Sequence, residues 1–218
     1  MEQYKREFIQ FLEGEGVLKF GDFTAKSGRK IPYFINAGMI KTGEDIAKLG
    51  EFYARAYFEK LGQKKAVLYG PAYKGISLSV SAAVALSKGG LNVPFFFNRK
   101  EVKDHGEGGV FVGYVPKAGE EVVIVEDVIT AGTAIRESMA ILSSLEDVKV
   151  AATFVMVDRK EKGKTEKSAM AEVEEEFGFP VYSVVDVYDI IEYLEEDDAN
   201  LENVTRIKNY LSVNGAKA

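Results

Sequence analysis

The chain has 218 residues, with no cysteine and a single histidine, and these absences exclude several kinds of site. Without cysteine there are no disulfides and no thiolate chemistry, which fits a reducing compartment. Zinc sites that hold a fold together are built almost entirely from cysteine and histidine. A structural zinc site is therefore not expected.

Long apolar runs and an excess of basic residues are also missing. No apolar run approaches the length that spans a membrane, and residues 1–7 are too charged for a signal peptide. The 28 lysines and arginines against 34 aspartates and glutamates give a net charge of −6. This balance argues against a nucleic-acid or anionic-membrane partner. We expect a cytoplasmic protein with no nucleic-acid and no membrane partner.

Apolar runs alternate with amphipathic segments along most of the chain. A helix should begin at Thr42, and later helices are predicted near residues 75–88, 133–145, 168–177, 187–195 and 199–212. Strands are predicted near residues 66–70, 94–97, 121–126, 149–157 and 180–185. This alternation predicts an α/β fold with a mainly parallel sheet flanked by helices.

The N-terminal segment, approximately residues 1–40, breaks this rhythm. It shows helical spacing over residues 3–13 and a hairpin pattern over residues 20–36. We expect it to form a small N-terminal cap, or hood, over one end of the sheet. No linker or repeat divides the chain, so residues 1–218 are predicted to form a single domain.

The most informative segment runs from Val122 to Ala134. Apolar β-branched residues lead into Glu126 and Asp127, then into a short Thr/Gly loop that opens a helix. Such a loop at the carboxyl end of a buried strand offers free N–H groups to a phosphate. Adjacent acids repel a bare phosphate but suit sugar hydroxyls, so the segment predicts a phosphorylated-sugar site. An ordinary capped helix, with Thr130 or Thr133 as N-cap, leaves the acids unexplained.

Two further loops follow predicted strands. Residues 70–75 combine two glycines with Lys74 at a helix start, where a cation is unfavourable unless an anion intervenes. This pattern favours a second phosphate site over a solvated turn lysine. Residues 98–109 contain several basic residues, the only histidine and three glycines. We expect a mobile lid over approximately residues 98–110, with a disordered surface loop as the alternative.

Two other features concern a flat, acidic ligand. Arg159 follows a predicted strand and offers paired donors for a carboxylate, although a surface salt bridge is the alternative. Phe34, in the hairpin, offers an aromatic face for a base, although a strand phenylalanine is more often core. Lys26 lies near the hairpin turn, from which it can reach over the end of the sheet.

Four of these segments together resemble the type I phosphoribosyltransferases, and specifically their orotate-specific members: residues 26–29, 70–75, 98–109 and 126–134. The resemblance implies the type I phosphoribosyltransferase fold. It also implies transfer of the phosphoribosyl group of phosphoribosyl diphosphate (PRPP) to orotate, giving orotidine 5-monophosphate and diphosphate in pyrimidine (UMP) biosynthesis. By the same resemblance, Mg²⁺ is held through PRPP without a direct protein ligand, and the protein is a homodimer whose lids cover the neighbouring site.

The resemblance also implies roles for individual residues. PRPP would be bound by Lys26, Tyr73, Lys74, Arg99, Lys100, Lys103, His105, Glu126, Asp127, Val128, Ile129, Thr130, Ala131, Gly132, Thr133 and Ala134. Orotate would be bound by Phe34, Ile35, Thr130 and Arg159, and the catalytic residues would be Lys103, Lys26, His105 and Asp127. Glu126 stands where many members have aspartate, and some relatives replace Ile35 by phenylalanine. The alternatives are a phosphoribosyltransferase for another base and a PRPP-sensing regulator.

Overall fold

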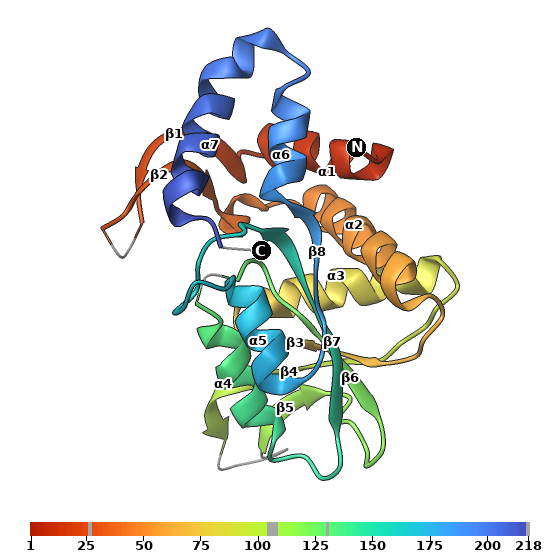
Figure 1. Cartoon of the computed structure of the whole chain (residues 1–218). Helices are drawn as coiled ribbons and strands as arrows, with labels where there is room; N and C mark the ends of the chain where they lie inside the picture. The colour runs from red at the N-terminus through yellow and green to blue at the C-terminus, as the bar shows by residue number, and fades with distance from the viewer. Residues whose placement is uncertain (26–27, 104–108, 130, 217–218) are drawn as a thin grey trace.

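The structure, a computed structural model, describes residues 1–25, 28–103, 109–129 and 131–216, with only the backbone of residues 102 and 103. Its centre is a six-stranded sheet in the order β5-β4-β3-β6-β7-β8 (Figure 1). The strands are β3 (Val67–Gly70), β4 (Phe95–Lys103), β5 (Gly109–Gly113), β6 (Glu121–Val125), β7 (Lys149–Asp158) and β8 (Val181–Asp186). All neighbours are parallel except β4 and β5. The predicted α/β class with a mainly parallel sheet is confirmed.

Helices cover both faces of this sheet. Helices α2 (Gly43–Leu61) and α3 (Lys74–Lys88) lie on one face, while α4 (Thr133–Leu142) and α5 (Ala169–Phe177) lie on the other (Figure 1). In β6, Val123 packs into the core on the α2 and α3 side, and Val122 and Ile124 pack into the opposite core. Because both faces are covered, the strand is apolar at successive positions rather than at alternate ones.

The N-terminal segment forms α1 (Gln3–Gly14), β1 (Leu18–Thr24), β2 (Lys30–Ile35) and a 3₁₀ turn, η1 (Ala37–Met39). Strands β1 and β2 pair as the predicted hairpin. This segment packs against α6 (Val187–Leu194) and α7 (Leu201–Asn214), which a second 3₁₀ turn, η2 (Asp198–Asn200), joins (Figure 1). The sequence did not predict this packing of the C-terminal helices on the N-terminal segment. The boundary of the hood stays a prediction.

The region after residue 97 differs from the sequence-based expectation. Strand β4 continues to Lys103 and pairs with β5, which was not predicted. The Nη1 atom of Arg99 also donates to the carbonyl oxygens of Gly109 (3.1 Å) and Phe111 (3.3 Å). The alternative of a disordered surface loop is therefore wrong for Asn98 and Lys103, because they pair with Phe111 and Gly109 of the antiparallel strand β5. Residues 104–108, with His105, lie outside the described residues, and the mobility of the lid stays a prediction.

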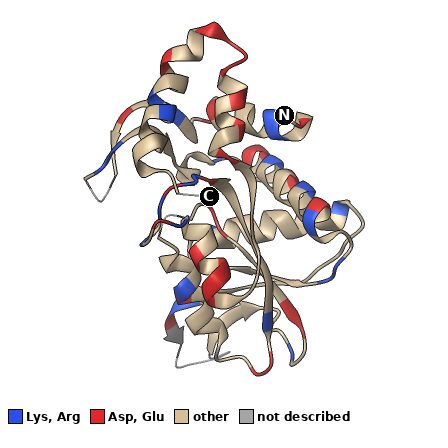
Figure 2. Cartoon of the chain, viewed as in Figure 1, with Lys and Arg blue, Asp and Glu red and all other residues tan. Residues whose placement is uncertain are grey.

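Charged residues lie mainly on the helices and loops, with both signs interspersed (Figure 2). Within the described ranges, no helix combines the length and the apolar content that crossing a membrane requires. The strands in the middle of the sheet are buried on both faces, so the charges that do occur near the sheet are concentrated where its strands end.

Candidate active site

The candidate site begins where β3 and β6 end side by side. Tyr69 in β3 is paired with Ile124 in β6, so the loops that follow the two strands leave the sheet together. In the sheet, β4 lies next to β3 on one side, and β6 lies next to β3 on the other side. This is the point at which strand order reverses, where open α/β sheets bind ligands.

The loop after β3 lies unusually close to the start of α3. A methyl group added at Gly75 would lie 2.6 Å from Cδ of Pro71 and 2.9 Å from the carbonyl oxygen of Val125. Gly70 is equally confined, because an added methyl group would lie closer than 3.0 Å to the carbonyl oxygen of Gly75. The two glycines therefore allow the first turn of α3 to rest directly on β3 and β6.

Asn98 holds the same loop from the neighbouring strand. Its Oδ1 atom accepts hydrogen bonds from the hydroxyl of Tyr69 at 2.8 Å and from the backbone N–H of Ala72 at 3.0 Å. The side chain is buried, at 7% exposure, so both donors are paired in the interior. This structural role of Asn98 was not predicted. A polar residue that ends the apolar run Phe95 to Phe97 was the available signal.

Glu126 and Asp127 lie at the carboxyl end of β6, and both side chains are buried. Nζ of Lys74 lies 2.7 Å from Oδ2 of Asp127, while Oδ1 of Asp127 accepts from the N–H of Val128 at 2.9 Å. The hydroxyl of Tyr53, on α2, donates to the carbonyl oxygen of Glu126 at 2.6 Å. The structure thus joins the two predicted phosphate and sugar loops through one ion pair. Tyr53 was not predicted, because its position on the apolar face of a helix gives no polar signal.

The carboxyl of Glu126 has an unusual protonation equilibrium. Burial raises its pKa to about 7, and the adjacent charge of Asp127 acts in the same direction. The backbone N–H of Asp127, which donates to Oε1 of Glu126 at 2.9 Å, partly opposes this rise. Glu126 is therefore largely protonated just below neutral pH and largely ionised above it.

This raised pKa predicts a pH-dependent stability. Since the folded pKa of Glu126 lies above its ordinary value of 4.5, its contribution is fully present below pH 4.5 and is lost as the pH rises through 7. Glu126→Gln cannot ionise. In urea unfolding, the variant should gain about 2 kcal/mol relative to the unchanged chain between pH 5 and pH 8. Parallel pH profiles for the two proteins would contradict this assignment.

The two residues that follow the acid pair, Val128 and Ile129, pack against the protein. Val128 forms a parallel bridge with Val157, and Ile129 is buried in the core beneath α4 and α5. Helix α4 begins at Thr133, with Gly132 as N-cap at φ +69° and no side-chain cap. A capping role for the Thr133 side chain is therefore excluded. Among the described residues, Gly132 and the exposed Thr133 offer backbone N–H groups of the first helical turn to a ligand.

A cavity of about 570 Å³ adjoins this loop. It is lined by Pro71, Ala72, Asn98, Arg99, Lys100, Val110, Glu126 and residues of α4, including Ala134. At its edge, the exposed ring of Tyr73 lies under the ammonium of Lys100, with 4.8 Å from Nζ to the ring centroid. The structure therefore brings these two predicted PRPP-binding residues together.

Arg159, at the end of β7, is held in a partly buried cluster. Its Nη2 atom lies 2.6 Å from Oε1 of Glu161, and its guanidinium lies 4.9 Å from the ring centroid of Tyr33. The side chain is only 13% exposed, so this is not the surface salt bridge considered above. The ion pair with Glu161 occupies Nη2, whereas the buried Nε atom has no hydrogen-bond partner among the described residues. One buried donor of the guanidinium is therefore left for an acceptor.

The other predicted base-binding residues lie on different faces of β2. The ring of Phe34 is 39% exposed and stacks on Phe23, whereas its neighbour Tyr33 faces Arg159. The side chain of Ile35 is buried in the core, so a ligand would meet only its backbone. Phe34 therefore lies on the opposite face of β2 from Tyr33, the residue that contacts Arg159. Lys26, His105 and Thr130 lie outside the described residues, as does the side chain of Lys103.

Residues 36–185 match the model of the phosphoribosyl transferase domain, so the chain belongs to the phosphoribosyltransferases. It is 50% identical over 201 residues to an orotate phosphoribosyltransferase of Clostridium acetobutylicum, covering 92% of this chain and 90% of the relative. It is 51% identical over 211 residues to the enzyme of Vibrio cholerae, covering 96% of this chain and 97% of the relative. Within its class, the chain belongs to the orotate phosphoribosyltransferase family.

A solved structure supports the same assignment. The orotate phosphoribosyltransferase of Francisella tularensis has a TM-score of 0.83 and 38% sequence identity, and the match covers 96% of this chain and 99% of that chain. The fold and the family that the sequence indicated are therefore confirmed, and the chain is a pentosyltransferase.

Proposed function

We propose that the chain transfers the phosphoribosyl group of PRPP to orotate and releases orotidine 5-monophosphate and diphosphate, in the synthesis of UMP. The observation that carries this proposal is the ion pair between Lys74 and Asp127, at 2.7 Å, at the point where strand order reverses. This ion pair places an ammonium that can bind phosphate beside carboxylates that can bind sugar hydroxyls. The family relationship reported above gives the class of reaction.

The residues around this ion pair divide the binding of PRPP between them. Lys74, Tyr73, Arg99 and Lys100 would bind the diphosphate, and the loop from Val128 to Ala134 would bind the 5-phosphate through its backbone. Glu126 and Asp127 would orient the ribose hydroxyls. As the bond to diphosphate breaks, positive charge develops on the sugar, and the buried carboxylates stabilise it in a site of low dielectric.

Orotate would lie near Arg159, whose buried donor suits its carboxylate. Lys26, from the turn of the hood, would contact PRPP and act as a catalytic residue. Phe34, Ile35 and Thr130 would complete the base site, with Ile35 contributing its backbone. Since the ring nitrogen of orotate is readily anionic, the reaction depends on positioning and electrostatics more than on a strong base.

Magnesium fits this arrangement as a partner of the substrate. The oxygen atoms of Glu126 and Asp127 are the kind of ligand that Mg²⁺ prefers, but Asp127 is already paired with Lys74 and Glu126 is largely protonated below pH 7. The ion would therefore be held by the diphosphate and ribose oxygens, where it neutralises the charge of the leaving group. No residue of the chain is proposed as a direct ligand.

We also propose that residues 98–110 form a lid that acts across a homodimer in the cytoplasm. Lys103 and His105, in the lid, would support the departing diphosphate and exclude water from the site. The β4–β5 hairpin gives this lid an anchored base, because its two strands are paired on both sides of the undescribed tip.

Lys103→Ala is expected to reduce kcat roughly 100-fold, the scale of losing one preorganised donor. The KM for PRPP should change much less, because Lys74 and the phosphate loop remain. Steady-state kinetics with both substrates measure this division. An increase in KM with kcat unchanged would make Lys103 a binding residue only.

Mixed dimers test whether the lid acts across the interface. Lys103→Ala chains are combined with Asp127→Asn chains, each nearly inactive alone. Random pairing makes about half of the dimers mixed. If the lid serves the neighbouring site, one site of each mixed dimer is intact, which is roughly a quarter of all sites. No recovery of activity after verified subunit exchange would place Lys103 in the site of its own chain.

The reaction itself is tested by the ultraviolet absorbance of orotate, followed with PRPP and magnesium. Orotate should be consumed, whereas uracil, which lacks the carboxylate, adenine and hypoxanthine should not. Arg159→Ala should weaken the binding of orotate and leave the affinity for PRPP nearly unchanged. Consumption of a purine, or of uracil at the same rate, would overturn the proposed substrate.

A further inference from the structure

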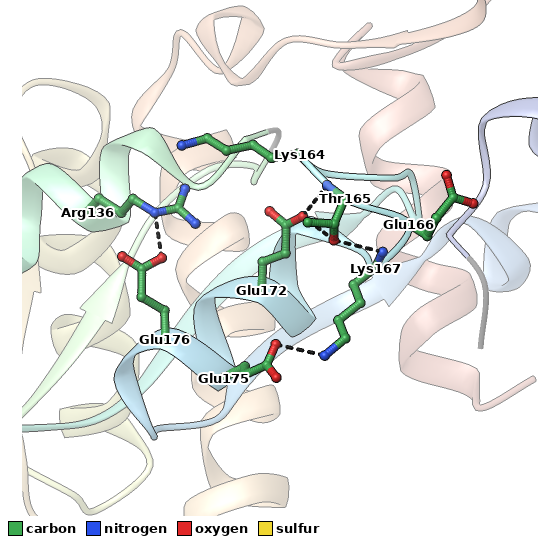
Figure 3. Close-up of a pocket in the computed structure, with 8 residues that line it drawn as sticks. All are labelled: Arg136, Lys164, Thr165, Glu166, Lys167, Glu172, Glu175 and Glu176. Carbon is green, nitrogen blue, oxygen red and sulfur yellow. Dashed lines mark hydrogen bonds and ion pairs between the residues drawn. The ribbon is translucent and has the colours of Figure 1, made fainter.

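Arg136 lies outside the set of residues assigned to either substrate, yet its side chain reaches the phosphate loop. It extends from α4 back to the loop, where Nη1 donates to the carbonyl oxygen of Ala131 at 2.6 Å. On its other edge, Nε donates to Oε2 of Glu176, on α5, at 2.7 Å (Figure 3). The guanidinium therefore bridges the loop that follows β6 and the helix that covers the same face of the sheet.

The bond to Ala131 fixes the orientation of a peptide in the loop. In a planar trans peptide, the carbonyl of one residue and the N–H of the next point in opposite directions. Because the carbonyl of Ala131 is directed to Arg136, the N–H of Gly132 is directed away from it. That N–H belongs to the segment to which the proposed function assigns the 5-phosphate of PRPP.

Gly132 makes room for this bridge. A methyl group added there would lie 2.9 Å from Nη1 of Arg136 and 2.8 Å from Cγ2 of Val173. Gly132 also has φ +69°, a conformation that other residues seldom adopt. The glycine in the phosphate loop thus serves the approach of the guanidinium as well as the turn of the backbone.

Glu176 balances the charge that this arrangement requires. A cation in the first turn of a helix is unfavourable with respect to the helix dipole, and Arg136 is the fourth residue of α4. The carboxylate of Glu176 compensates for this and holds the planar guanidinium by its second edge. Lysine could not reproduce both contacts, since it presents a single point charge.

We propose that Arg136, held by Glu176, is a positioning residue for the 5-phosphate loop: it fixes the Ala131–Gly132 peptide so that the loop binds PRPP. This inference rests on the proposed function. Arg136 itself touches neither substrate. The bridge borders an open pocket of about 810 Å³ and is exposed to water, so its loss should leave the fold intact.

The same pocket supplies a matched control. Glu175 precedes Glu176 on α5 and pairs with Lys167 at 2.8 Å (Figure 3). Lys167 lies in the loop before α5 and has no contact with the phosphate loop among the hydrogen bonds and ion pairs of the described residues. Glu175→Gln therefore removes one carboxylate and one ion pair from the same helix without releasing Arg136.

The experiment compares Arg136→Gln, Arg136→Lys, Glu176→Gln and Glu175→Gln in the complete enzyme. Arg136→Gln should raise the KM for PRPP about 10-fold, since small displacements of binding groups have effects of this size. The KM for orotate should change less than about twofold. The KM for PRPP of Arg136→Lys and of Glu176→Gln should lie between the values for Arg136→Gln and the unchanged enzyme. The KM of Glu175→Gln should equal that of the unchanged enzyme.

Inhibition by product-like probes separates positioning from general damage. The inhibition constant of ribose 5-phosphate, which reports on the phosphate loop, should rise with the KM for PRPP. The inhibition constant of diphosphate, which reports on the loop after β3, should stay unchanged. Equal losses for both probes, or Glu176→Gln behaving like Glu175→Gln, would overturn the inference. An unchanged enzyme that turns over no PRPP with orotate would instead reject the proposed function.

Discussion

Gly70→Ala is expected to destabilise the protein by about 3 kcal/mol or more, at the upper end of overpacking effects. The added methyl group would lie closer than 3.0 Å to the carbonyl oxygen of Gly75 and to Oγ of Ser79. One of these atoms is backbone and the other belongs to a fully buried side chain, so neither can move aside cheaply. To remove this steric overlap, the start of α3 would have to move away from β3, and this movement would separate Lys74 from Asp127.

Urea unfolding of the two proteins measures this effect. The control is Gly43→Ala, at the first position of α2, where an added methyl group meets nothing within 4 Å. Alanine there should leave the stability unchanged or raise it slightly, because it is the better helix former. A Gly70→Ala protein that unfolds within about 1 kcal/mol of the unchanged chain would show that the start of α3 yields easily.

Asp127→Asn should reduce kcat roughly 1,000-fold, at the upper end for loss of a preorganised electrostatic group. The substitution preserves size and retains an oxygen to accept the N–H of Val128. It removes the charge that balances the cationic sugar. It also turns an amide toward Lys74, which then loses its only ion-pair partner among the described residues.

Glu121→Gln is the control for this variant. Glu121 lies at the other end of the same strand and pairs with Lys64 at 2.9 Å, so the control removes an ion pair of β6 away from the proposed site. Its kcat should be unchanged. If Asp127→Asn keeps more than about a tenth of the unchanged kcat, the carboxylate does not stabilise the developing charge.

The sequence predicted the central sheet and the two loops at its switch point. Both predictions depend on local signals: buried strands such as Val122 to Val125 form continuous apolar runs, and a glycine-flanked loop with Lys74 comes between a strand and a helix. The carboxyl ends of parallel strands meet at one edge, so local signals sufficed to place the two loops together. Their actual link, Lys74 to Asp127, follows from that placement.

Other features depend on partners that are distant in sequence and carry no local signal. Strand β5 exists because Phe111 pairs with Asn98, and a basic, glycine-rich segment gave no sign of this pairing. The partners of Arg159, Glu161 and the ring of Tyr33, depend on the side-chain direction after β7 and on the packing of β2, neither of which the sequence indicates. Along β2, successive side chains point to opposite faces, so Phe34 is exposed while Tyr33 is buried. Closeness in sequence alone does not show this separation.

The union of the two chain ends has a consequence for synthesis on the ribosome. Lys5 pairs with Asp189, 184 positions later, and Arg6 pairs with Glu196, 190 positions later. Strands β3 to β7 can assemble as they emerge, but the N-terminal segment must wait for α6 and α7. The N-terminal helix would therefore reach its final packing only near the end of translation, so a nascent chain would complete this part of the fold last.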